Sequence, residues 1–241
     1  MKPTNLNLKP SLLAIVVSTS LLTACGSDDD NDVLVTPEPA PVVMQTFSVT
    51  VTNLTANQPM SPVILASHSA DAMLWQAGEP ASVAIEKMAE GGDTADIAAL
   101  EVVNSSVNGV GMLMPGMSET LILTLAEADV ANISLATMLV NTNDAFTGLN
   151  SISIAGMQVD MPSMMHNMAY DAGTEDNSEQ KGTIPGPADG GEGFNANRDD
   201  VDFVHIHPGV ITQYDGLDDS VLMPSHRFDN PVLAVKIVRT Q

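Results

Sequence analysis

The stretch FSVTVT at residues 47–52 decides the fold class, because apolar and polar side chains alternate along it without a break. Phenylalanine and two valines occupy the odd positions, whereas one serine and two threonines occupy the even positions. This period of two puts every apolar side chain on one face, as in a strand with one buried and one solvated face. We therefore predict that a β-strand opens the folded part of the chain, which begins near Gln45.

Later segments extend this β pattern. Apolar or β-branched runs predict five more strands, at 62–67, 121–125, 133–140, 204–207 and 232–238. Nothing after residue 45 has the composition of a linker. The sequence therefore indicates one all-β domain over residues 45–241, with short helical insertions.

Two short helices and one long loop are expected between these strands. Residues 80–90 suit a helix, because Pro80 fits a first helical turn and the glycine pair that begins at Gly91 ends it. Residues 93–100 suit a second, shorter helix. Residues 172–200 are rich in glycine, aspartate and asparagine and have no periodicity, so we predict a long loop there.

The start of the chain has the features of an export signal. Lys2 and Lys9 precede an uncharged, mostly apolar run at 11–22, which is shorter than the roughly 20 residues that span a bilayer. The sequence LTAC, which ends at Cys25, resembles the lipobox of bacterial lipoproteins. We therefore expect residues 1–24 to be a lipoprotein signal peptide and Cys25 to be lipidated. An ordinary signal peptide followed by an incidental cysteine is the alternative.

Residues 25–44 suit a tether between a lipid anchor and the folded domain. The acidic run GSDDDND at 26–32 cannot bury a core, and the three prolines after it favour extended chain. Residue 26 is glycine and not aspartate, which by resemblance to the lipoprotein sorting rule of Gram-negative bacteria favours the outer membrane. We expect an outer-membrane lipoprotein held to the lipid bilayer of a bacterial cell envelope. The domain lies on either the periplasmic or the surface face of that membrane, and the sequence does not decide between the two.

Charge and composition exclude several classes of function. The 241 residues contain 8 lysines and arginines against 30 aspartates and glutamates, for a formal net charge of −22. No basic surface is available to neutralise phosphates, so nucleic acid is not an expected partner. The single cysteine excludes an internal disulfide framework and any four-cysteine metal site. A hydrophobic content of 44% is nevertheless enough to build a core.

Two acidic motifs are candidates for a metal site. The sequence DAGTE places Asp171 and Glu175 four residues apart, and a turn at Gly173 would point both at one spot. The sequence NTND at 141–144 follows a predicted strand and adds Asp144. Oxygen-only donors of this kind suit Ca²⁺. A solvated acidic turn and a simple Asx turn are the alternatives.

Several segments together resemble the spondin domain, including its bacterial members. They cover almost all of the chain after residue 45, and they are FSVTVTNLT (47–55), QPMSP (58–62), GEPAS (78–82), EGGDT (90–94), MLVNTNDAFTG (138–148), YDAGTE (170–175), HIHPG (205–209) and the last predicted strand. The resemblance implies a C2-like antiparallel β-sandwich with one calcium ion near its loop edge.

The resemblance also implies which residues bind the calcium ion. Asp144, Asp171 and Glu175 fall on the ligand positions of the family. The chain departs from animal members in two ways, with Ala145 where they have tryptophan and Glu175 where they have aspartate. The cysteines of the animal domain are also absent here, so we expect the ion to take over part of their stabilising role.

Two further groups of side chains are candidate metal ligands. His205 and His207 are two residues apart, so a strand would turn both imidazoles to the same side, toward a metal or simply into packing and hydrogen bonds. A methionine-rich stretch suits Cu(I), or it fills a core that lacks aromatic residues. It contains Met157, Met161, Met164, Met165, Met168 and His166.

No catalytic residue is predicted. The sequence has no G-x-S-x-G elbow, no H-E-x-x-H helix, no phosphate-binding loop and no dinucleotide fingerprint. We expect a non-catalytic, envelope-anchored, calcium-binding module that serves adhesion or binds a protein or polysaccharide partner. The alternative function is a copper-binding lipoprotein that uses residues 157–168 with His205 and His207.

Overall fold

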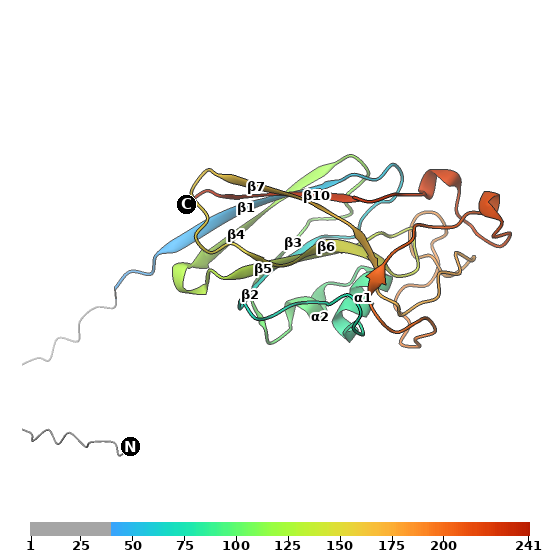
Figure 1. Ribbon diagram of the computed structural model, residues 1–241, viewed down its shortest axis with the longest axis horizontal. Helices are drawn as coiled ribbons and strands as arrows, with labels where there is room; N and C mark the ends of the chain where they lie inside the picture. The colour runs from blue at the N-terminus through green and yellow to red at the C-terminus, as the bar shows by residue number, and fades with distance from the viewer. Residues whose placement is uncertain (1–39) are drawn as a thin grey trace, which may run out of the picture. The chain divides into compact units, whose positions relative to one another are not determined.

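The computed structural model describes residues 40–241. The predicted signal peptide, the lipidation site Cys25 and most of the predicted tether lie outside the described residues, so they stay predictions. The described chain forms two antiparallel β-sheets that face each other, with two short helices against the outer face of one of them (Figure 1). The predicted all-β sandwich with helical insertions is therefore confirmed.

The first sheet has four strands in the order β4-β1-β10-β7. Their bounds are β1 Met44–Asn53, β4 Ser118–Ala126, β7 Pro162–Asn167 and β10 Leu233–Arg239. The predicted alternation is confirmed, because Val49 is fully buried and lies between Leu121 and Ile237 of the neighbouring strands. The threonines of the other face pair across strands, as in the hydroxyl contact of 2.9 Å between Thr50 and Thr120.

The second sheet has six strands in the order β3-β2-β5-β6-β8-β9. Their bounds are β2 Ile64–His68, β3 Val103–Asn108, β5 Asn132–Met138, β6 Ala145–Ser153, β8 Ala169–Asp171 and β9 His205–Ile206. Every residue of β5 is buried, because the first sheet covers one of its faces and α1 packs on the other. The predicted strand at 204–207 is only two residues long here.

Helix α1 spans Val83–Gly91 and α2 spans Ala95–Ala98. The first begins later than the predicted residue 80, because the Ser82 hydroxyl accepts a hydrogen bond from the backbone N–H of Ile85 and caps the helix. It ends as predicted at the glycine pair, where Gly92 adopts a left-handed conformation with φ of 70°. Three single-turn 3₁₀ helices follow at Glu127–Asp129, Gln213–Asp215 and Pro224–His226.

A second core lies between the six-stranded sheet and α1, and it contains a cluster of three aromatic rings. Phe146 lies edge-on to Trp75 with centroids 5.2 Å apart and stacks on Tyr170 at 5.6 Å. Phe146 on β6 and Tyr170 on β8 are also direct register partners. This packing holds the beginning of β6 against the end of β8.

The chain between β8 and β9 forms the predicted long loop, without a strand or helix of its own. It returns to the sheet through backbone hydrogen bonds from Asp199 N–H to Thr174 O and from Asp202 N–H to Gly173 O. Within residues 40–241, no helix has both the length and the apolar character needed to cross a membrane.

Candidate metal centre

Two buried aspartates meet at the end of the six-stranded sheet. Asp144 closes the turn that joins β5 to β6, where the Thr142 hydroxyl donates to Leu139 O and accepts from the N–H of Ala145. Asp171 is the last residue of β8, and its register partner is Ala145. Because Asp144 directly precedes Ala145, the antiparallel pairing places the backbones of the two aspartates next to each other. Both residues are fully buried.

The two oxygens of Asp144 have unequal surroundings. Oδ2 accepts hydrogen bonds from the backbone N–H groups of Thr174 at 2.8 Å and Glu175 at 3.1 Å, while the Thr174 hydroxyl, 3.3 Å away, makes its shorter contact of 2.6 Å with Glu90 Oε1. Oδ1 is buried, and among residues 40–241 it has no hydrogen-bond partner. A buried carboxylate oxygen without a partner is costly, so this atom is a candidate cation ligand.

Asp171 is held by its own turn. Its Oδ1 accepts the N–H of Gly173 at 2.8 Å, and its Oδ2 accepts the side-chain amide of Asn177 at 2.6 Å. Gly173 has a φ of +69°, and a Cβ there would collide with the backbone of Phe203. The turn predicted at Gly173 is present, and only glycine suits its conformation and its close approach to residue 203.

The two aspartates resist being ionised together. Burial raises the pKa of Asp144 well above its usual range, and the nearby carboxyl of Asp171 raises it further. A divalent cation between the two carboxyls would replace this repulsion with attraction to both. The electrostatics of the pair therefore suit a bound cation.

Glu175, the third predicted ligand, is only partly brought to this pair. Its backbone N–H bonds Asp144, but its carboxylate Oε1 accepts the side-chain amide of Asn143 at 3.0 Å. Burial raises the pKa of Glu175 to about 7, and Glu90 has the largest effect among three acidic groups that raise it further. The Glu175 carboxylate is therefore engaged by Asn143, and the structure does not bring it to the aspartate pair as the family resemblance implies.

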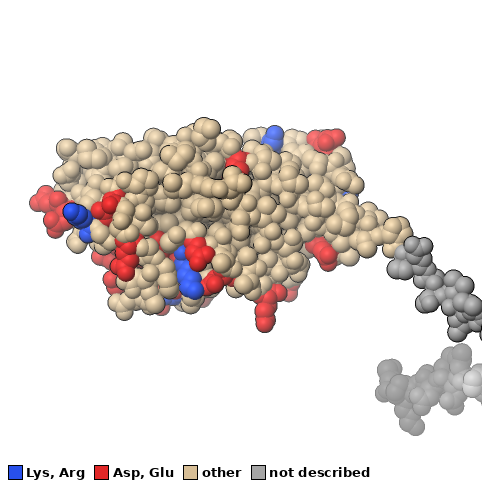
Figure 2. Space-filling model, turned by 180° about the vertical axis from the view of Figure 1, so that it is seen from behind, with Lys and Arg blue, Asp and Glu red and all other residues tan. Residues whose placement is uncertain are grey.

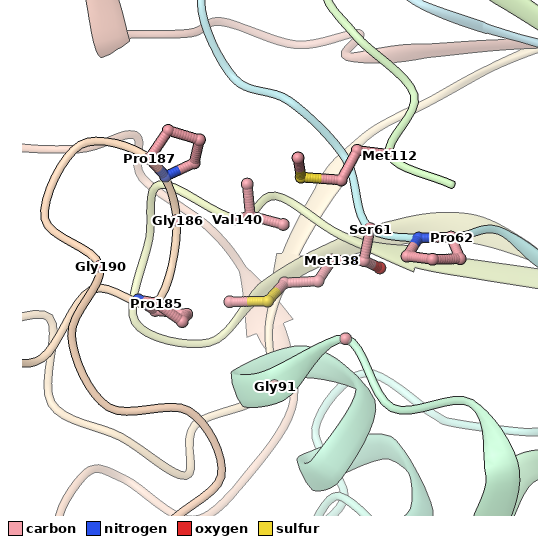
Figure 3. A pocket seen from close by; sticks show the side chains of 11 residues that line it. Ser61, Pro62, Gly91, Met112, Met138, Val140, Pro185, Gly186, Pro187 and Gly190 are labelled. Atoms are coloured by element: carbon pink, nitrogen blue, oxygen red, sulfur yellow. The ribbon is translucent and has the colours of Figure 1, made fainter. Parts of the chain in front are cut away.

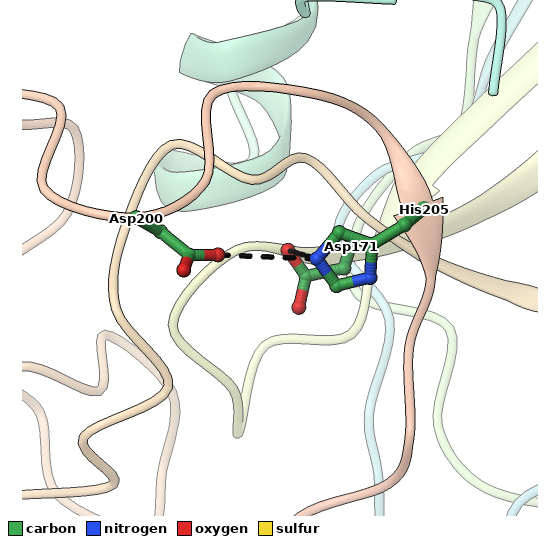
Figure 4. A group of neighbouring side chains, drawn as sticks. All are labelled: Asp171, Asp200 and His205. Atoms are coloured by element: carbon green, nitrogen blue, oxygen red, sulfur yellow. Dashed lines mark ion pairs between the residues drawn. The ribbon is translucent and has the colours of Figure 1, made fainter. Parts of the chain in front are cut away.

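The structure brings His205 to Asp171, together with a residue that the sequence analysis missed. The Nε2 atom of His205 lies 3.4 Å from Asp171 Oδ1 and 3.9 Å from Asp200 Oδ2 (Figure 4). One donor atom from each of these residues lies within 4.8 Å of the other two, which is close enough for all three to contact one ion. No spacing rule points to Asp200, because only the return of the long loop places it here.

His207 follows the end of β9 at Ile206, and it approaches the same carboxylate as His205 does, with its Nε2 atom 3.9 Å from Asp171 Oδ2. Its Nδ1 accepts the N–H of Gly209 at 2.9 Å, so Nε2 carries the proton and donates to Asn177 Oδ1 at 3.2 Å. Burial lowers the pKa of His207 to about 4, which keeps the ring neutral. His207 thereby fixes Asn177, which in turn bonds Asp171.

The predicted copper stretch is divided by the fold. Met157 and Met165 are partly buried and pack against the core between the sheets. Three other methionines of the stretch, Met161, Met164 and Met168, are exposed on and beside β7. Core filling thus accounts for two of the five thioethers, and copper binding by the rest stays a prediction.

A separate apolar cavity of about 360 Å³ lies beside the end of α1 (Figure 3). Met112, Met138, Val140 and two prolines of the long loop, Pro185 and Pro187, form much of its wall. None of its lining residues, all of them in the described part of the chain, carries a charge. It offers a recess for apolar groups and is not part of the aspartate site.

Comparison with known proteins agrees with the family resemblance. The family model described as Spondin_N matches residues 52–184, which is more than half of the chain. The matched range contains Asp144, Asp171 and Glu175 and ends before Asp200 and His205. No curated protein matches the chain.

Proposed function

Because the chain belongs to the spondin N-terminal domain family, which indicates an extracellular binding module, we propose that it is a calcium-stabilised, non-catalytic β-sandwich module. In this proposal the domain serves adhesion, or binds a protein or polysaccharide partner, from a lipid anchor at Cys25 in a bacterial outer membrane. The anchor rests on the apolar run and the lipobox-like sequence before Cys25.

The observation that carries the calcium proposal is the buried, unpartnered Oδ1 of Asp144 next to the carboxyl of Asp171. Carboxylate oxygens are the donors that Ca²⁺ prefers, so the two residues fit the ion that the family implies. Bound calcium would supply positive charge to two carboxyls that otherwise repel each other. Asp144 and Asp171 would hold it, and Glu175 would complete the set if its side chain left Asn143.

Calcium at this position would organise the surface that meets a partner. Asp144 belongs to the turn between β5 and β6, whereas Asp171 ends β8 directly before the long loop. An ion bound to both would tie these segments together at one end of the sandwich. Figure 2 shows most charged side chains of that face gathered at this end, while the sheets present a mostly uncharged surface. The loop end is therefore the proposed binding surface.

Thermal unfolding of the full chain tests the calcium site. The protein is stripped with chelator and then titrated with Ca²⁺ while the melting temperature is followed. Extracellular calcium modules bind with dissociation constants of about 10⁻⁴–10⁻³ M, and a hundredfold excess would add about 2.7 kcal/mol to the free energy of unfolding. A melting temperature that saturating Ca²⁺ leaves unchanged would exclude the site.

Matched variants separate specific binding from general charge effects. Asp144→Asn should abolish the calcium-dependent shift, and Glu175→Gln should weaken calcium binding. Asp218→Asn removes one negative charge from an exposed position and should keep the full shift. Equal responses from Asp144→Asn and Asp218→Asn would show that calcium acts only on the overall charge.

A further inference from the structure

We propose that His205, Asp171 and Asp200 form a second cation position that takes a divalent transition metal of the Zn²⁺ type. This position goes beyond the proposed calcium site. The two positions share Asp171, but the second one does not need Asp144. It lies partly outside the range matched by the family, because both Asp200 and His205 follow residue 184.

The tautomer of His205 in its neutral ring makes Nε2 available as a metal ligand. Its Nδ1 lies 3.1 Å from the backbone oxygen of Ile206, which can only accept a hydrogen bond. Nδ1 therefore carries the proton, and in the neutral ring Nε2 presents a lone pair. That lone pair faces the oxygens of two carboxylates (Figure 4). Three potential metal-ligand atoms thus lie within 4.8 Å of one another, an arrangement that suits a cation between them.

The distances around His205 Nε2 suit a metal ion. A charged imidazolium would donate to a carboxylate at about 2.7–2.9 Å, but the two N···O separations are 3.4 Å and 3.9 Å. Donor atoms around a tetrahedral Zn²⁺ with bonds of about 2.0–2.2 Å are about 3.3–3.6 Å apart. The shorter separation falls within this range, whereas Asp200 lies farther out and would have to move inward to complete the site.

The aspartates at and beside this position have no lysine or arginine partner among the described residues. Within residues 40–241, no lysine or arginine forms an ion pair with Asp144, Asp171 or Asp200. Asp171 is fully buried, and the neighbouring Asp144 Oδ1 is buried without a partner. The described chain therefore supplies no permanently charged cation to Asp171, only the imidazoles of His205 and His207.

The surroundings also resemble those of a metal ligand shell. The carbonyl of Ile206 orients His205, and Gly173 and Asn177 orient Asp171, as outer hydrogen bonds do for metal ligands. The His205 side chain is 29% exposed, which leaves room for a water molecule to complete the coordination. One imidazole and two carboxylates suit Zn²⁺, Co²⁺ or Mn²⁺ better than Ca²⁺, which prefers oxygen alone.

The test is metal binding by the full chain, with Zn²⁺ and Co²⁺ as the probes. The chelated protein is titrated with Zn²⁺ by calorimetry, and Co²⁺ is added separately to record its visible d–d absorption. We expect one Zn²⁺ per chain and a Co²⁺ spectrum that Zn²⁺ displaces. His205→Gln and Asp200→Asn should each weaken Zn²⁺ binding by at least about tenfold. His166→Gln, which changes an exposed histidine on β7, is the matched control and should bind like the wild type.

The outcomes separate this proposal from the calcium proposal. His205→Gln should lose Zn²⁺ binding but keep the calcium-dependent melting shift, whereas Asp144→Asn should lose the shift but keep Zn²⁺. If the wild type binds Zn²⁺ but shows no calcium-dependent melting shift, the calcium proposal fails and the second position stands. Zn²⁺ binding by His205→Gln at wild-type affinity, or no Zn²⁺ binding by the folded wild type, would overturn the second position.

Discussion

At the scale of single residues, the proposed calcium site depends on the unequal surroundings of the two carboxylate oxygens of Asp144. Two backbone N–H groups satisfy one oxygen of its carboxylate, while the other oxygen is buried without a partner in the described chain. The structure tolerates this arrangement beside a second carboxyl only at a cost in stability. That cost is the physical reason why a cation would stabilise the fold.

Replacing Asp144 should therefore stabilise the protein when calcium is absent. In Asp144→Asn the amide oxygen can keep the hydrogen bonds from Thr174 and Glu175, and the amide nitrogen can donate toward Asp171. We expect the free energy of unfolding in chelator to rise by about 1–3 kcal/mol, measured by urea denaturation. A less stable variant in chelator would mean that the wild-type carboxylate is already compensated.

Glu179 gives a pH-dependent prediction that is independent of the metal site. It is buried, its Oε1 accepts the N–H of Ile211, and its Oε2 has no partner in the part of the chain that the structure describes. Burial raises its pKa from 4.5 to about 7. The folded state therefore binds the proton more tightly than the unfolded state does. Between about pH 4.5 and 7 this group makes stability fall as pH rises.

Glu179→Gln should remove that dependence. We expect the difference in unfolding free energy between pH 5 and pH 8 to shrink by about 3 kcal/mol, as measured by urea denaturation in chelator. Glu127→Gln, at a solvated position, is the control and should leave the difference unchanged. An identical pH profile in Glu179→Gln and wild type would show that the buried carboxyl is not protonated in this range.

Sequence reasoning reached some of these residues and not others. Asp144 stands out because it follows a predicted strand, and Asp171 because it opens the sequence DAGTE, but the register of β6 with β8 that brings them together was not predicted. Asp200 carries no such signal, because it reaches His205 only through the return of a loop about thirty residues long. Glu175 has the right spacing, but its side chain is directed by Asn143, which no sequence pattern specifies.

At the scale of elements, the tight turn after β8 positions Asp171. Gly173→Ala should lower the free energy of unfolding by at least about 1–2 kcal/mol, because the new methyl group meets the backbone of Phe203 and φ is +69°. Gly182→Ala is a matched control, since φ there is +93° but no atom lies within 4 Å of the added methyl. If urea denaturation shows the same loss of unfolding free energy in both variants, the positive φ alone explains the loss, and the close contact with Phe203 contributes nothing.

The aromatic cluster is the second element that supports the site. Phe146→Ala removes a fully buried ring that packs on Trp75 and Tyr170, and it should cost about 3–5 kcal/mol. Because Phe146 fixes β6 against β8, calcium affinity should fall as well. Phe194→Ala removes a partly exposed ring and should cost much less. Equal losses in the two variants, measured by denaturation and calcium titration, would refute this supporting role.

The strands that the sequence predicts are those with one clear environment on each face. β1 alternates because one face is buried and the other solvated. β7 was not predicted, because it is an edge strand whose side chains are exposed or only partly buried, so no alternation marks it. β6 was missed because Thr147, Gly148 and Asn150 interrupt its apolar run, although its first five residues are buried like those of β5.

At the scale of the whole molecule, the chain carries 30 acidic residues against 8 basic ones. Sodium ions screen this repulsion in general, whereas calcium should act mainly at Asp144 and Asp171. We expect Ca²⁺ to raise the melting temperature of the chelated protein more than NaCl at the same ionic strength does. Equal effects of the two salts would mean that screening, and not a site, explains the response.

The most direct test of the central claim is to locate the ion. Crystals of the full chain grown with Ca²⁺ are examined by anomalous diffraction. We predict a peak about 2.3–2.6 Å from Oδ1 of Asp144 and from a carboxylate oxygen of Asp171. A map with no ion between the two side chains, and with Asp144 Oδ1 at hydrogen-bond distance from a water molecule or from an Asp171 oxygen, would contradict the calcium site.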